Sequence, residues 1–201
     1  MITETARTAT RQNAGNELRE IALAQFASVG FAATSLQQIA DAAGYSKSTV
    51  LYHFASKETL LGEVLTPAID RLEEILDRFV SAGHEGARTV FIDDFIDFLL
   101  QFRLELHTFI NQGQSLVGIA VIDRARALIV RLSETLCDEG STTEERLRFG
   151  VALGGAAYSL IAGMTFFDDA EIAPPDELRE ALRTVITELL APVPRTARGG
   201  R

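Results

Sequence analysis

T-S-L-Q-Q-I-A-D-A-A-G-Y-S-K-S-T-V-L-Y-H-F-A-S-K-E-T-L-L, residues 34–61, is the stretch of this chain that decides its fold. It predicts two short helices joined by a turn, followed by the start of a third helix. Gly44 stands where a helix ends in a left-handed residue, which glycine adopts without a steric penalty. Ser46 then offers an N-cap oxygen to the next helix. This close connection is typical of a helix-turn-helix, whose second helix lies in the DNA major groove.

The predicted second helix has two faces of different chemistry. Val50 and Phe54 are four residues apart and are expected to face inward, which leaves polar and large side chains on the opposite face. Lysine pairs with guanine edges, and an outward leucine packs against a thymine methyl group. Ser56 is expected to cap a further helix, whose first amides and Lys57 ammonium would bind one phosphate. The predicted DNA-binding residues are Ser35, Gln37, Lys47, Ser48, Thr49, Leu51, Tyr52, His53 and Lys57. The alternative interpretation is an ordinary surface helical hairpin.

Residues 22–61 resemble the DNA-binding domain of the tetracycline-repressor (TetR) family. The shared motifs are F-x-x-x-G from Phe26, A-T-S from Ala33, I-A from Ile39, A-G-Y-S-K from Ala43, L-Y-H-F from Leu51 and S-K-E-x-L from Ser56. Leu51 stands where the family usually has an aromatic residue that contacts a phosphate, and Gln25 stands where it usually has leucine. The resemblance implies a DNA-binding homodimer and a C-terminal domain with a small-molecule pocket.

The rest of the chain predicts an all-α fold. Apolar residues recur at spacings of three and four over 201 residues, without convincing alternation of period two. We expect a flexible tail (1–15), a three-helix DNA-binding domain (16–61), a helical ligand-binding and dimerisation domain (62–191) and a disordered tail (192–201). The first helix is expected over residues 16–29. One cysteine, Cys137, and an N-terminus without an apolar stretch indicate a cytoplasmic protein.

The net charge of −9 at first argues against a nucleic-acid partner. Its distribution removes the objection, because residues 1–61 hold five basic and five acidic side chains. Both lysines of the protein, Lys47 and Lys57, lie in this part. Locally placed cations still release counterions from phosphates, so we expect binding that depends on sequence and salt.

The helix that begins at Ser56 is expected to continue to about Val80, with a kink or break at Pro67. A helix over residues 87–105 carries a phenylalanine stripe that is most simply core, with a cavity lining as the functional alternative. Residues 107–115 are expected to form a polar loop before a helix over 117–137. The predicted ligand-binding residues are Phe95, Phe98, Phe102, His107, Asn111 and Tyr158, which suit an apolar effector with a few directional hydrogen bonds.

Phe149 to Phe167 is a run of 19 residues without a charge. Its length would fit a membrane span, but glycines and alanines keep its hydrophobicity modest, so a helix buried on two faces is the better interpretation. Leu147, Val151, Tyr158 and Ile161 are expected to face the subunit core. Helices over about 142–167 and 175–190 are predicted to form a four-helix interface between two copies.

Three classes of function remain after these observations. The first is a ligand-responsive regulator, most simply a repressor that leaves its operator when a small, largely apolar effector binds. The second is a DNA-binding regulator without a small ligand, which a protein partner controls. The third is an enzyme, against which the sequence shows no metal cluster, phosphate loop or nucleophile–base set, and its three histidines lie in separate segments. We therefore expect no catalytic residue, no metal and no cofactor.

Overall fold

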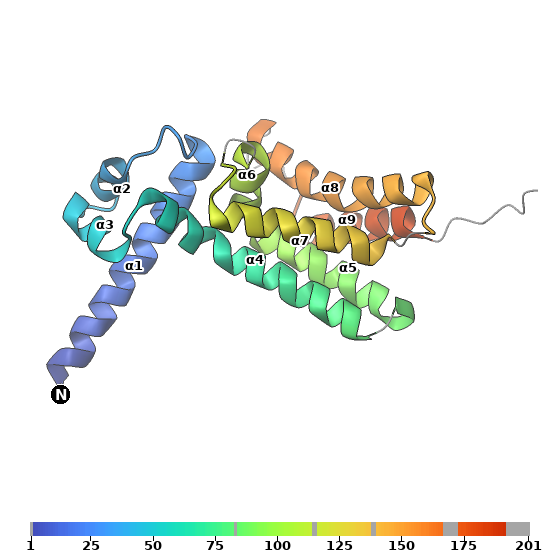
Figure 1. Cartoon of the computed structure of the whole chain (residues 1–201), viewed down its shortest axis with the longest axis horizontal. Coiled ribbons are helices and arrows are strands. Elements are labelled where there is room, and N and C mark those ends of the chain that lie inside the picture. The colour runs from blue at the N-terminus through green and yellow to red at the C-terminus, as the bar shows by residue number, and fades with distance from the viewer. Residues whose placement is uncertain (1, 83, 114–115, 138–139, 167–172, 192–201) are drawn as a thin grey trace, which may run out of the picture. The chain divides into compact units, whose positions relative to one another are not determined.

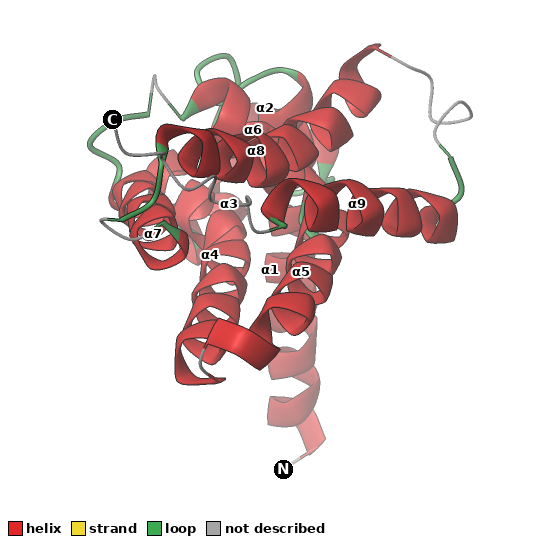
Figure 2. Cartoon of the chain, turned by 90° about the vertical axis from the view of Figure 1, so that its right-hand side faces the viewer, coloured by secondary structure: helices red, strands yellow, loops and turns green. Residues whose placement is uncertain are grey.

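The computed structural model confirms the all-α fold class. It describes residues 2–82, 84–113, 116–137, 140–166 and 173–191, and within these ranges it contains nine helices and no strand (Figures 1 and 2). The helices are α1 (Ile2–Ser28), α2 (Leu36–Ala42), α3 (Lys47–His53), α4 (Lys57–Ala82), α5 (His84–Gln101), α6 (Arg103–Gln112), α7 (Ala120–Leu136), α8 (Thr143–Phe166) and α9 (Pro175–Leu190). No helix among the described residues is long and apolar enough to cross a membrane.

Contacts divide the chain into two compact units. The first contains residues 1–73 and 102–128, and the second contains residues 74–101 and 129–201. This division differs from the expected boundary at residues 61 and 62, because α6 and the first half of α7 belong with the helix-turn-helix. The expected C-terminal tail, 192–201, lies outside the described residues.

The first unit is built on α1, α2 and α3. Its core contains Leu18, Ala22 and Phe26 from α1, Ile39 and Ala40 from α2, and Val50 and Phe54 from α3 and its C-cap. The inward orientation of Val50 and Phe54 is therefore confirmed. The expected tail over 1–15 is corrected, because α1 begins at Ile2 and continues through this segment.

The structure also differs from two expectations about helix ends. Pro67 lies inside α4, which extends from Lys57 to Ala82, so the helix does not break at this proline. The expected loop over residues 107–115 is instead largely helical, since α6 contains residues 103–112. The stripe helix also ends earlier than expected: Phe102 is the N-cap of α6, which separates α5 from α6.

The second unit has an aromatic core. Four phenylalanine rings follow one another, with centroid distances of 5.0 Å from Phe79 to Phe91, 5.9 Å from Phe91 to Phe95 and 6.0 Å from Phe95 to Phe98. All four side chains are buried, as is Cys137. Such a row contributes both apolar burial and offset ring contacts, so the core interpretation of the stripe is confirmed for Phe91, Phe95 and Phe98.

Helices α8 and α9 pack against each other and against α5 in the second unit. Thr142 and Glu145 form a capping box at the start of α8: the Thr142 amide donates to the Glu145 carboxylate (2.7 Å), and the Glu145 amide donates to the Thr142 hydroxyl (3.2 Å). Two ion pairs, Arg179–Asp97 and Arg183–Asp93, join α9 to α5. They fix which face of α9 is turned to the protein interior.

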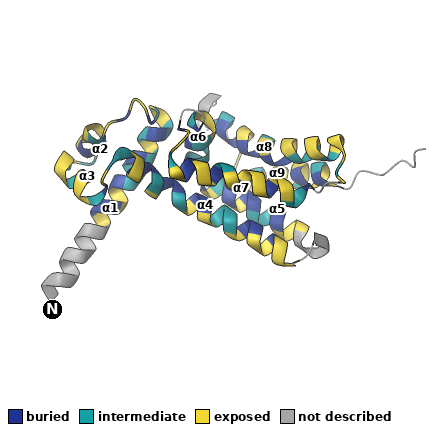
Figure 3. Ribbon diagram, in the orientation of Figure 1, coloured by how far each residue is buried: buried dark blue, intermediate teal, exposed yellow. Residues whose placement is uncertain are grey.

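The predicted orientation of α8 is wrong. Leu147, Val151 and Tyr158 were expected to face the subunit core, but they are 64%, 52% and 55% exposed. The core contacts are made by the other face, which carries Ala152, Leu153, Ala156, Ala157, Leu160 and Ile161. Of the four expected inward residues, Ile161 alone is buried, and Figure 3 shows the outer turns of α8 as exposed.

Candidate nucleic-acid interface

The turn between α2 and α3 has the geometry expected of a helix-turn-helix. Gly44 has φ = 70°, in the left-handed region, and the amide of Tyr45 donates to the carbonyl of Ala40 (2.9 Å). The Ser46 hydroxyl accepts from the amide of Thr49 (3.2 Å), which caps α3. A side chain at position 44 would adopt this φ only with strain, so the turn depends on glycine.

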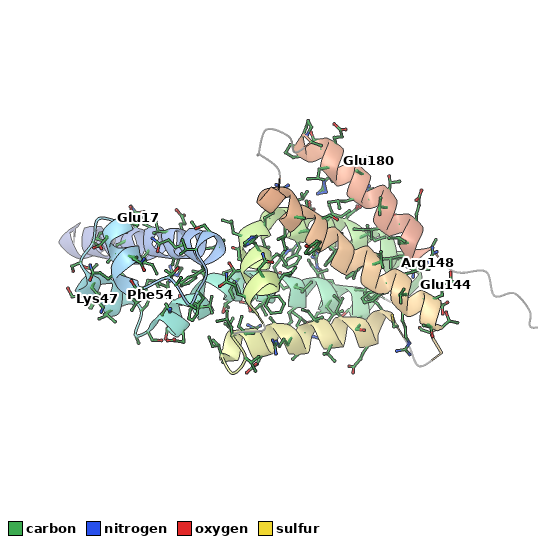
Figure 4. All side chains as sticks on the ribbon, turned by 90° about the horizontal axis from the view of Figure 1, so that it is seen from above. Glu17, Lys47, Phe54, Glu144, Arg148 and Glu180 are labelled. Carbon is green, nitrogen blue, oxygen red and sulfur yellow. The ribbon has the colours of Figure 1, made fainter. Side chains whose placement is uncertain are left out.

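The outer face of α3 presents one cation and several side chains suited to DNA (Figure 4). Lys47 and Ser48 are exposed, and Leu51 and Tyr52 are 45% and 65% exposed. Thr49 is half-buried, and its hydroxyl lies 2.9 Å from that of Ser46. His53 is half-buried and its ring lies edge-on to Tyr52, with centroids 5.5 Å apart. The exposed surface of α3 therefore combines a positive charge, a hydroxyl and two large apolar groups.

Two further residues that are predicted to bind DNA, Ser35 and Gln37, lie at the start of α2. Ser35 is the N-cap of α2: its hydroxyl accepts from the Gln38 amide (3.2 Å), and its own amide donates to the Gln38 side chain (2.8 Å). Gln37 is exposed, and its side-chain amide donates to Asp41 (2.7 Å). Ser35 therefore caps α2, while Gln37 lies on the surface.

Lys57, which is predicted to bind a phosphate, makes hydrogen bonds within the first unit. Its ammonium group donates to the carbonyl oxygens of Phe31 (2.7 Å) and Thr34 (2.8 Å) and lies 4.3 Å from the centroid of the Phe31 ring. These partners are 26 and 23 residues earlier in the chain, in the connection between α1 and α2. Lys57 is thus half-buried and bonded within the first unit, whereas Lys47 is exposed.

Sequence reasoning missed the residues that hold α1 against the helix-turn-helix. The Tyr45 hydroxyl donates to Glu17 (2.9 Å), and this bond raises the pKa of the Tyr45 hydroxyl. Arg19 donates to Glu63 (2.9 Å) and lies over the Phe54 ring at 5.4 Å. Their partners are 28 to 44 residues away in the chain, so no local pattern could have identified them.

The predicted ligand-binding residues are divided between the two units. Phe95, Phe98 and Tyr158 belong to the second unit, whereas Phe102, His107 and Asn111 belong to the first. Phe95 and Phe98 are core side chains, and Tyr158 and Asn111 are exposed.

Helix α6 nevertheless carries polar atoms that are shielded from solvent. Arg103 Nε, His107 Nδ1 and Thr108 Oγ1 are buried, and none has a hydrogen-bond partner among the described residues. Burial also lowers the pKa of His107 and raises the pKa of Glu105. Buried polar groups normally have hydrogen-bond partners, so these three atoms are exceptions within the described part of the chain. The described residues contain no cluster of three or more metal-ligating side chains.

Comparison with known proteins finds similarity over part of the chain. Residues 18–64 match the family model of bacterial regulatory proteins of the tetR family. The repressor KstR2 of Rhodococcus jostii is 36% identical over 74 residues, which are 37% of this chain and 36% of that protein. The regulator RutR of Escherichia coli is 49% identical over 49 residues, 24% of this chain and 23% of that protein. The chain thus matches only about a third or less of the length of these relatives.

The likeness to solved structures extends further along the chain. A TetR-family transcriptional regulator from Bordetella parapertussis has a TM-score of 0.65, with 88% of this chain and 94% of that chain covered. Its sequence identity is 23%, so the likeness shows a shared fold alone.

Proposed function

We propose that this chain, which belongs to the TetR family through its residues 18–64, represses transcription as a homodimer bound to a palindromic DNA operator. A small, largely apolar effector releases it. The relatives named repressor or regulator support the DNA-binding class, and the exposed face of α3 supplies the chemistry.

The observation that carries the proposal is the division of α3 into two faces. Val50 is fully buried, while Lys47, Leu51 and Tyr52 are exposed on a helix held by a capped turn. Lysine bonds to guanine edges or phosphates, and Leu51 and Tyr52 offer apolar contact to thymine methyl groups and sugars. A neutral first part of the chain then obtains specificity mainly from shape and base contacts rather than from excess charge.

The exposed apolar surface of α8 and α9 supports the homodimer. Leu147, Val151 and Tyr158 on α8, together with Val185 on α9, lie exposed, and Gly150 and Gly154 share the exposed face of α8. A Cβ atom added to either glycine would meet nothing within 4 Å in this chain. A partner helix can therefore approach this face closely, and a two-fold axis would place two α3 helices about 34–36 Å, or one DNA turn, apart.

The effector part of the proposal is supported by α6. Thr108 is fully buried with an unpartnered hydroxyl, and His107 Nδ1 is buried in the same state. These groups would supply the few directional bonds that an apolar effector with one polar end requires.

One observation favours a second candidate, a DNA-binding regulator without a small ligand that a protein partner controls. The rings of the stripe, which could have lined a cavity, instead pack against one another at Phe91, Phe95 and Phe98. The two candidates share the operator and differ only in what releases it.

Selection of bound duplexes from a random DNA library tests the proposal. The dimer should enrich a palindrome whose half-sites are centred about one helical turn apart, with a dissociation constant of about 10 nM or tighter at physiological salt. Failure to enrich any sequence would exclude both candidates. A series of saturated fatty acids is then added to the preformed protein–DNA complex to distinguish the two candidates. Release of the DNA by a member of the series supports the effector-controlled repressor. Absence of release and of any thermal stabilisation throughout the series favours the protein partner.

A further inference from the structure

Gln112, the last residue of α6, bonds twice to the segment where α1 ends. Its side-chain amide donates to the carbonyl oxygen of Phe26 (2.6 Å), and its side-chain carbonyl accepts from the amide of Phe31 (2.5 Å). The two partners lie 86 and 81 residues earlier in the chain. One planar amide group therefore bridges both sides of the α1 C-terminus, and Figure 1 shows α6 beside that end of α1.

The bridged segment is the connection that leads to α2. Gly30 inside it has φ = 97°, and the Thr34 hydroxyl and amide both donate to its carbonyl (2.8 and 3.1 Å). Ser35, the N-cap of α2, follows directly. Gln112 therefore bonds to the connection, and hydrogen bonds within the connection hold it up to the N-cap of α2. Helix α2 in turn packs against α3.

The two partners of Gln112 need one donor and one acceptor, and a neutral primary amide supplies both. Phe26 offers a carbonyl oxygen, which needs a donor, and Phe31 offers an amide, which needs an acceptor. A carboxylate would lose the donor, and an apolar side chain of the same length would lose both bonds. Both bonds are part-buried, so a group left without its partner would lose free energy that water only partly restores.

We propose that Gln112 is a positioning residue for operator binding: it fixes the α1–α2 connection and thereby the placement of α3 on DNA. This inference rests on the proposed function and assigns a role in it to a residue outside the helix-turn-helix. Lys57 holds the same connection from α4 through the carbonyls of Phe31 and Thr34. Gln112 holds its other side, so that the connection keeps one geometry without help from DNA.

The test compares Gln112→Met with wild type on the operator selected by the wild-type dimer. Loss of both bonds should weaken operator binding about 10-fold or more at a temperature where circular dichroism shows both proteins folded. Hydrogen exchange at the Phe31 amide should become faster, because that amide loses its acceptor. Gln101→Met is the matched control, since Gln101 is exposed on α5 and the same substitution there should leave affinity unchanged.

Gln112→Glu provides a test by rescue. The ionised carboxylate keeps an acceptor for Phe31 but faces the Phe26 carbonyl without a proton, so binding should be weak at pH about 8. Protonation restores a donor, and the affinity relative to wild type should recover as the pH falls towards about 5. A purely structural role would lower thermal stability without this pH-dependent recovery of affinity.

Two outcomes would overturn the inference. One is wild-type operator affinity in Gln112→Met despite faster exchange at Phe31, and the other is a Gln112→Glu affinity that follows wild type at every pH. If the wild-type dimer itself enriches no duplex, the proposed function fails instead, and the exchange rate at Phe31 still reports whether the bridge exists.

Discussion

The ammonium group of Lys57 lies 4.3 Å from the centre of the Phe31 ring and donates to the carbonyl oxygen of the same residue at 2.7 Å. Phe31 thus binds one cation through both its ring and its backbone, while its own amide donates to Gln112. Lys57, which follows the helix-turn-helix, and Gln112, which lies 81 positions after Phe31, both bond to the connection between α1 and α2.

Substitution of Lys57 by Met should destabilise the first unit rather than weaken a phosphate contact. Two charge-assisted hydrogen bonds and one cation–π contact are lost, so the free energy of unfolding should fall by about 2 kcal/mol. Denaturant unfolding measures this loss. The salt dependence of operator binding should keep its wild-type slope, and a slope reduced by about one unit would show instead that Lys57 contacts DNA.

Substitution of Lys47 by Ala should weaken operator binding and leave the free energy of unfolding almost unchanged. Lys47 is exposed on α3, so unfolding should change by no more than about 0.5 kcal/mol. Operator affinity should fall, and the slope of log K against log salt should decrease by about one if Lys47 neutralises a phosphate. Arg88→Ala, which removes an exposed charge from α5, is the control and should leave both quantities unchanged. Loss of the dimer in Lys47→Ala would show that this face of α3 is misassigned.

Substitution of Gly154 by Leu should leave the single chain folded but weaken the dimer. A Cβ atom at this position meets nothing within 4 Å, and leucine favours a helix over glycine by roughly 0.8 kcal/mol, so the single chain should fold. The larger side chain should hold a partner helix away and shift sedimentation towards the monomer. Ser133→Leu, on the exposed side of α7, controls for the added apolar group. A dimer that persists in Gly154→Leu would place the interface elsewhere.

Substitution of Glu105 by Gln should stabilise the protein at neutral pH. Burial raises the pKa of Glu105 above 4.5, although a bond from its own backbone amide partly opposes this. Below pH 4.5 the carboxyl is protonated in folded and unfolded chains alike. As pH rises from 4.5 through the higher folded pKa, the unfolded chain ionises more readily, so wild-type stability falls.

Thermal unfolding of wild type and Glu105→Gln at pH about 4 and about 7.5 measures this difference. The advantage of Glu105→Gln should be larger at the higher pH. Burial lowers the pKa of His107 on the same helix, which costs stability as pH falls below 6.5, but this contribution is common to both proteins. An advantage that grows as the pH falls would contradict the assignment of a raised pKa to Glu105.

Local chemistry explains why the helix-turn-helix could be predicted from the sequence. The caps at Ser35 and Ser46 bond to amides three residues later, and the turn at Gly44 needs only its own φ. Such bonds can be predicted from the sequence, because both partners lie within one turn of helix. The boundary between α5 and α6 was missed for a related reason: Phe102 caps α6 without a side-chain hydrogen bond, so no polar residue marks the break.

The sequence by itself determined the all-α fold, the capped turn and the exposed face of α3, since each depends on residues within one or two helical turns. Tertiary structure alone decided the orientation of α8, whose apolar residues surround the helix and give no preferred face. It also decided that Lys57 holds the α1–α2 connection and that Gln112 bridges its other side. Those partners lie between 23 and 86 residues away, and only the packing of distant helices brings such groups within hydrogen-bonding distance.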